Sequence, residues 1–177
     1  MFPITINGRL TDSAPGVTIL AALRASGVDV PTLCDDPRLA PIGACRLCVV
    51  EVDGQPRSVA ACTTPVAPNM VIHTHTPQLE EIRRTILRLL AQNYPAQAVR
   101  DDPSPALHRL IRAYDLEHEL RGEFQAALLD DSHPCIHVDM SRCIACFRCV
   151  RICDEIVGQF VWRAWDRGDR TEIRSAN

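Results

Sequence analysis

The chain has 177 residues, enough for one ordinary domain or two small ones. Its formal net charge is −3, and all 19 basic residues are dispersed arginines, so no nucleic-acid partner is expected. No apolar run approaches the ~18 residues of a membrane span, which argues against direct membrane insertion. Because the N-terminal segment lacks signal-peptide composition, we expect a cytoplasmic location, which favours metal ligation over disulfides as the role of the 9 cysteines.

The first elements predict a small mixed sheet around one helix. An Asn7-Gly8 turn of type I′ between apolar residues predicts a hairpin over residues 4–10. Thr18 is the predicted N-cap of a helix that ends at Gly27. Further strands are expected at residues 49–52, 55–60 and 70–74. This order of elements is typical of a β-grasp layout.

The N-terminal cysteines have a spacing that suits a 2Fe-2S cluster, and they are Cys34, Cys45, Cys48 and Cys62. A binuclear cluster needs two thiolates on each iron, so a close pair joined by two distant cysteines fits it. Gly43 and Ala44 precede the close pair and would let backbone amides approach the sulfides. The alternatives are a structural zinc site, which usually has two close pairs, and disulfides.

A long helix is predicted to follow the sheet. Thr76 is its expected N-cap, and Tyr94-Pro95 follows its end. Its buried side is expected to carry Leu79, Ile82, Ile86, Leu89 and Leu90, and its exposed side Arg83, Arg84 and Arg88. Residues 96–132 are predicted to be a linker with a helix at 106–116. No role is expected for the surface histidines His73, His75, His108 and His118.

A second cysteine group, with spacings of two, two and three residues, consists of Cys143, Cys146, Cys149 and Cys153. Three cysteines on one tight loop can bind three corners of a 4Fe-4S cubane. In two-cluster ferredoxins the fourth cysteine of such a run binds the other cluster and a proline usually follows it, whereas here Asp154 follows. The fourth ligand is therefore Cys153, Cys135 or a residue outside this sequence. Cys135 lies on a predicted strand and is otherwise a buried or free thiol.

The C-terminal residues predict a hairpin with strands at 160–165 and 171–174. Trp162 and Trp165 are expected to pack against the protein. Arg46, Arg142, Arg148 and Arg151 flank the cysteines, where they would either favour the reduced clusters or pair with surface carboxylates.

The motif order PTLC, GACRLCVVEV, ACTTPV and SHPCIHVDMSRCIACFRCVRICDEIVGQFVW resembles the iron–sulfur region of the large (alpha) subunit of molybdenum- or tungsten-dependent formate dehydrogenases. It is more distantly similar to the large peripheral subunit of respiratory complex I and to the diaphorase subunit of NAD-reducing hydrogenases. The resemblance implies a 2Fe-2S cluster on the first four cysteines. It also implies a 4Fe-4S cluster on Cys143, Cys146 and Cys149, with Cys153 serving an adjoining cubane.

We therefore expect an α+β chain with three parts: a β-grasp 2Fe-2S ferredoxin-type domain at 1–76, a helical linker at 77–132, and a partial 4Fe-4S ferredoxin-type domain at 133–177. The expected function is electron relay in a formate dehydrogenase-like oxidoreductase, without a substrate-binding catalytic site of its own. Expected partners are a redox protein or catalytic subunits of the pterin and flavin/NAD types. A zinc-stabilised interaction domain and an iron–sulfur redox sensor are the alternatives.

Overall fold

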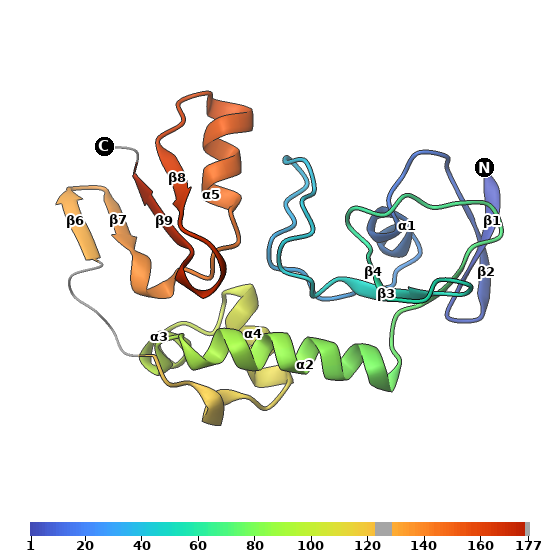
Figure 1. Ribbon diagram of the computed structural model, residues 1–177, viewed down its shortest axis with the longest axis horizontal. Coiled ribbons are helices and arrows are strands. Elements are labelled where there is room, and N and C mark those ends of the chain that lie inside the picture. The colour runs from blue at the N-terminus through green and yellow to red at the C-terminus, as the bar shows by residue number, and fades with distance from the viewer. Residues whose placement is uncertain (123–128, 176–177) are drawn as a thin grey trace. The chain divides into compact units, whose positions relative to one another are not determined.

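The computed structural model describes residues 1–122 and 129–175. Contacts between Cα atoms divide the chain into two compact units, Met1–Ile86 and Leu87–Asn177, and both can be followed by colour in Figure 1. Residues 123–128 of the predicted linker and 176–177 of the predicted third part lie outside the described residues. The division at residues 76 and 132 stays a prediction.

A mixed five-stranded sheet forms the first unit, and its order is β2-β1-β5-β3-β4. The strands are β1 (Phe2–Ile6), β2 (Arg9–Ser13), β3 (Val49–Val52), β4 (Val59–Ala60) and β5 (Val71–His73). The β1 and β5 strands are parallel, whereas the other neighbours are antiparallel. This confirms the α+β β-grasp prediction, although β4 is much shorter than the predicted strand at 55–60.

The first hairpin forms as its turn residues predict. Asn7 has φ 50° and Gly8 has φ 80°, and two positive φ angles define the type I′ turn that matches the twist of the two strands. Ile4 and Ile6 are buried and are separated by the half-buried Thr5, so this hairpin contributes one face to the core.

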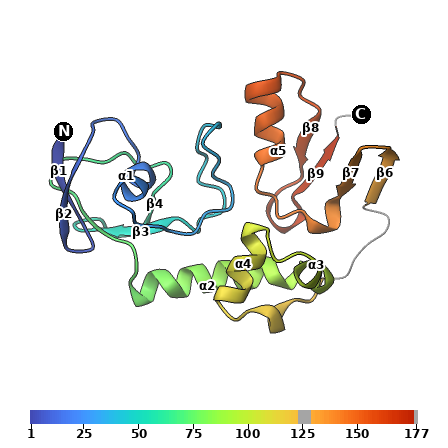
Figure 2. The same cartoon turned by 180° about the vertical axis from the view of Figure 1, so that it is seen from behind.

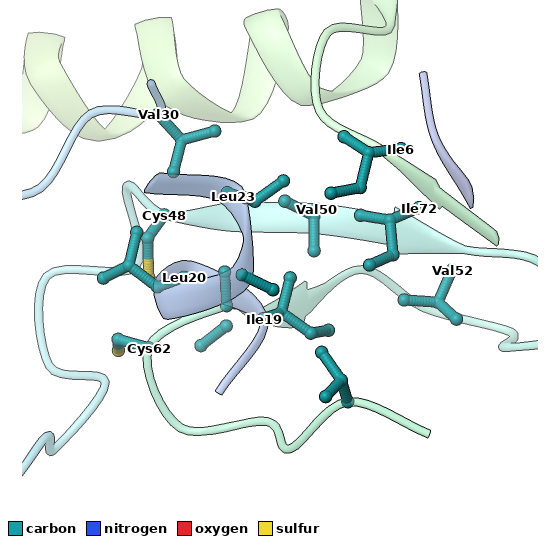
Figure 3. Close-up of a cluster of buried hydrophobic side chains, with 14 of the residues drawn as sticks. Ile6, Ile19, Leu20, Leu23, Val30, Cys48, Val50, Val52, Cys62 and Ile72 are labelled. Atoms are coloured by element: carbon teal, nitrogen blue, oxygen red, sulfur yellow. The ribbon is translucent and has the colours of Figure 1, made fainter. Parts of the chain in front are cut away.

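One helix, α1 (Ile19–Ala25), packs on the sheet and encloses the core of the first unit. The Oγ1 atom of Thr18 accepts a hydrogen bond from the Ala21 amide at 3.3 Å, as expected of an N-cap, and Gly27 with φ 72° follows the helix end. Figure 3 shows Leu23 of α1 directed toward the sheet near Val50. The core therefore lies between one helix and the centre of the sheet.

The long helix is α2 (Pro77–Gln92), and Thr76 Oγ1 accepts a hydrogen bond from the Leu79 amide at 3.2 Å, which confirms the predicted cap. Its fully buried positions recur every four residues and are Leu79, Arg83, Leu87 and Ala91. The prediction that Arg83 faces away from the buried side is therefore wrong. Leu89, predicted to be buried, is 59% exposed.

The second unit contains α3 (Ala96–Asp101), α4 (Ala106–Ala113) and the short η1 (Glu117–Glu119). His108 on α4 is buried, so its predicted surface position is wrong. Its Nε2 atom pairs with the Tyr94 hydroxyl at 2.8 Å, and its Nδ1 atom contacts the Asp102 carbonyl. Both ring nitrogens are satisfied, which allows the imidazole to be buried. His118 is exposed, as predicted.

Two hairpins, both visible in Figure 2, precede and follow the second cysteine group in sequence. Their elements are β6 (Leu129–His133), β7 (Ile136–Asp139), η3 (Met140–Arg142), α5 (Arg148–Arg151), the π-helical η4 (Ile152–Val157), β8 (Trp162–Trp165), η5 (Gly168–Arg170) and β9 (Glu172–Ser175). The predicted C-terminal hairpin is confirmed. The predicted packing of Trp165 is wrong, because that side chain is 50% exposed. Among the described helices, none has the length and apolar composition that crossing a bilayer requires.

Candidate metal centres

The sheet brings the last two cysteines of the first group together. Cys48 directly precedes β3 and Cys62 follows β4, and these antiparallel strands pair Val49 with Ala60. The Ala61 amide donates a hydrogen bond to the Cys48 carbonyl at 3.1 Å. Both cysteines are buried and lie close to α1 in Figure 3.

The other two cysteines come from the loop between α1 and β3, drawn in light blue in Figure 1. The Cys45 amide donates to the Cys34 sulfur at 3.5 Å, and the two thiols share a hydrogen bond. That bond from Cys34, together with backbone amides such as that of Leu47, lowers the pKa of Cys45 to about 5. The same bond raises the pKa of Cys34.

Burial raises the pKa of Cys48 to about 12, and the neighbouring sulfur of Cys62 contributes through its charge and a hydrogen bond. The four sulfurs therefore form two pairs, Cys34 with Cys45 and Cys48 with Cys62. The charge of Cys45 also raises the pKa of Cys48, so the two pairs lie close enough to interact electrostatically.

The loop backbone around the close pair turns sharply. Gly43 and Arg46 have φ angles of 64° and 56°, in the region that favours glycine. A Cβ atom on Gly43 would lie in van der Waals contact with Cγ2 of Thr63, at 3.4 Å and next to Cys62, so the backbone here runs close to the fourth cysteine segment. Such turns direct consecutive amides toward one side, where they can bind anionic sulfur.

The second group lies on a loop that leads into a helix. Ala145 and Phe147 have φ angles of 49° and 60°, and the Ala145 amide donates to the Cys143 sulfur at 3.4 Å. Cys143 and Cys149 are solvent-exposed, yet partial desolvation by the surrounding loop raises the pKa of both, and the charge of Cys146 adds to both shifts. The three sulfurs are therefore close enough for their charges to interact.

Cys153 differs from the three loop cysteines because it is buried on η4. Its sulfur accepts a hydrogen bond from the Val161 amide at 3.2 Å. Cys135 lies in the turn between β6 and β7 and is exposed, so its predicted placement on a strand is wrong.

The donor set fits iron–sulfur clusters. Within residues 1–122 and 129–175, no three His, Cys, Asp or Glu side chains converge to hold one metal ion. Two pairs of thiols instead match the two irons of a binuclear cluster, each of which needs two thiolates. Assigning individual cysteines to irons stays a prediction.

The arginines expected to offset cluster charge are mostly solvent-exposed. Arg46 and Arg148 are exposed, and exposed Arg142 donates to the Asp139 carboxylate at 2.7 Å. Water and salt screen such charges strongly. Arg151 is buried, but the deepest buried arginine is Arg83, which the sequence reasoning missed.

Two protein families match the chain. Residues 1–77 match the 2Fe-2S iron-sulfur cluster binding domain. Residues 133–177 match the ferredoxin-like domain of NADH-quinone oxidoreductase subunit 3.

Curated relatives match almost the whole chain. A component of the NADH-quinone oxidoreductase of Rhizobium meliloti is 34% identical over 98% of this chain and 21% of its own length. The 75 kDa subunit of the NADH-ubiquinone oxidoreductase of Reclinomonas americana is 34% identical over 98% of this chain and 26% of its own length. The alpha subunit of the NADPH-Fe(3+) oxidoreductase of Geobacter sulfurreducens is 34% identical over 98% of this chain and 21% of its own length.

The chain thus spans only about a fifth to a quarter of these relatives. A chain in the crystal structure of NAD+-reducing [NiFe]-hydrogenase in the H2-reduced state superposes with a TM-score of 0.85 at 30% identity, covering 99% of this chain and 75% of that one. These matches confirm both predicted clusters, and they confirm the resemblance to complex I and to the hydrogenase. The chain belongs to the same iron–sulfur protein family as the matched chain of NAD+-reducing [NiFe]-hydrogenase, and it is similar to about a quarter of the 75 kDa subunit of NADH-ubiquinone oxidoreductase.

Proposed function

We propose that this chain relays single electrons between a 2Fe-2S and a 4Fe-4S cluster within a multi-subunit oxidoreductase. The observation that carries the proposal is the placement of the first four cysteines beside a β-grasp core, with the Cys45 amide 3.5 Å from the Cys34 sulfur and with Cys48 and Cys62 at the ends of the paired strands β3 and β4. The clusters supply one-electron redox chemistry when bound. The chain's own residues hold the irons, direct amides toward the sulfurs and exclude water.

For the first cluster, the pairing supports Cys34 and Cys45 as ligands of one iron and Cys48 and Cys62 as ligands of the other. The hydrogen bond with Cys45 raises the pKa of Cys34, and burial raises the pKa of Cys48. Both thiols must lose their protons to bind metal, and the positive charge of iron offsets that cost. Three of the four sulfurs are buried in the first unit, so the protein shields this centre from water on the core side.

For the second cluster, we propose Cys143, Cys146 and Cys149 as three ligands, with Cys153 completing this cubane or serving an adjoining one. The buried position of Cys153 and its amide hydrogen bond support it over Cys135. We also propose a cytoplasmic location, because a reducing compartment keeps cysteines available as metal ligands.

The partners we propose are a flavin/NAD-type subunit and a catalytic subunit. The flavin/NAD-type subunit is supported by the relatives, which include subunits of NADH and NADPH oxidoreductases. The likeness of the cysteine motifs to formate dehydrogenases favours a pterin-type catalytic subunit. Purifying the native complex through a tag on this chain, then assaying flavin and molybdenum or tungsten, tests each partner separately.

A redox titration of the anaerobically purified chain tests the relay. We expect electron paramagnetic resonance to show two separate one-electron steps, one for the binuclear signal and one for the cubane signal. Each step should reverse on reoxidation, because a relay must return its electron. A chain that accepts no electron down to the potential of dithionite would contradict the proposal.

A further inference from the structure

The buried stripe of α2 contains a charged residue at a position that apolar side chains otherwise occupy. Leu79, Arg83, Leu87 and Ala91 follow one another at four-residue spacing, and each is 0% exposed. Burying a guanidinium is unfavourable unless hydrogen bonds replace its water. Arg83 must therefore be held by specific partners.

Those partners are backbone carbonyls at the end of the cysteine loop and at the start of β3, 36 and 34 residues away in sequence. The Nε atom of Arg83 donates to the Leu47 carbonyl at 3.2 Å, and Nη2 donates to the Val49 carbonyl at 2.9 Å. These two carbonyls belong to the residues on either side of Cys48. The third nitrogen, Nη1, donates to Oε1 of Glu80 at 2.6 Å.

This contact fixes the backbone at Cys48. A peptide bond is planar and trans, so a Leu47 carbonyl directed at Arg83 turns the Cys48 amide to the opposite side. The Cys48 carbonyl is held independently by the Ala61 amide at 3.1 Å, beside Cys62. The Cys48 segment is thus fixed by α2 and by the fourth cysteine segment.

The positive charge of Arg83 also affects the reduction potential of the cluster. A guanidinium stays protonated at every accessible pH, and this one is shielded from solvent. Its ion-pair partner Glu80 is 40% exposed, so water weakens the opposing charge. A buried cation beside a site that gains negative charge on reduction stabilises the reduced form.

We propose that Arg83 is a positioning residue of the 2Fe-2S site, which orients the Cys48 segment through Leu47 and Val49 and raises the reduction potential of the cluster. This rests on the proposed function, in which Cys48 is a ligand. Arg83 acts on the cluster through the loop backbone and through its charge.

The test compares Arg83→Met, Arg83→Lys and the control Arg84→Met, an exposed arginine on the same helix. For Arg83→Met we expect the equilibrium constant for cluster reduction to fall at least tenfold, which equals about 59 mV for one electron. Iron loss to a chelator should accelerate at least tenfold. Arg83→Lys keeps the charge but lacks the planar fork, so it should keep most of the potential and still lose iron faster.

An Arg83→Met chain whose potential and iron-release rate equal those of Arg84→Met would overturn the proposal. If circular dichroism shows that Arg83→Met does not fold, Arg83→Lys decides, and iron release at the unsubstituted rate would overturn it. Failure of the proposed function looks different, because the unsubstituted chain would then show no binuclear signal.

Discussion

Cys48→Ser is expected to abolish the 2Fe-2S signal and to remove about two irons per chain. The serine hydroxyl is a poor replacement, because iron–sulfur clusters select soft thiolate ligands. The Cys48 side chain is 1% exposed beside Cys62, so no solvent-exposed ligand can easily take its place. Iron analysis and electron paramagnetic resonance of the dithionite-reduced chain measure both effects.

The second cluster provides the internal standard for this experiment. Its proposed ligands lie in Leu87–Asn177, whereas Cys48 lies in Met1–Ile86, so the cubane signal should keep its intensity. Cys135→Ser is the matched control, because it removes an exposed thiol outside the proposed ligand set. A Cys48→Ser chain that keeps a full binuclear signal would show that the ligand assignment is wrong.

Leu23→Ala is expected to lower the free energy of unfolding of the first unit by about 3 kcal/mol, within the usual range for a buried leucine. Leu23 is 0% exposed and lies between α1 and the sheet (Figure 3), where its removal leaves a cavity. Leu10→Ala on β2 is the control, since Leu10 is 72% exposed and its loss should change stability by less than about 0.5 kcal/mol.

Native-state hydrogen exchange measures this change inside the first unit alone. The amides of Thr5 and Asn7 donate to the Met70 and Ile72 carbonyls at 2.8 Å and report on the junction of β1 with β5. A loss of about 3 kcal/mol corresponds to roughly a hundredfold faster exchange. Equal exchange rates in Leu23→Ala and Leu10→Ala would contradict the proposed core.

The sequence predicted the features that depend on neighbouring residues. Asn7-Gly8 encodes its turn through two positive φ angles, and Thr18 caps α1 with its own hydroxyl. The cysteine spacing indicated the clusters because ligation requires close pairs on tight loops. Each of these signals lies within a few residues of the structure it specifies.

The missed features depend on distant partners. Arg83 is buried because the carbonyls of Leu47 and Val49 accept its hydrogen bonds, and no local sequence pattern reveals these partners. His108 is buried because Tyr94 and Asp102 satisfy its ring nitrogens. Sequence patterns predict that a charged or polar side chain is exposed. Only the fold shows when hydrogen-bond partners within the protein replace the water molecules that would otherwise solvate it.

The central claim is that this chain binds one binuclear and one cubane cluster through two separate sets of cysteines. Mössbauer spectroscopy of the chain reconstituted anaerobically with ⁵⁷Fe tests it most directly. The account predicts about one third of the bound iron in a 2Fe-2S spectrum and about two thirds in a 4Fe-4S spectrum. A spectrum containing a single cluster type, or iron bound only as isolated ions, would contradict it.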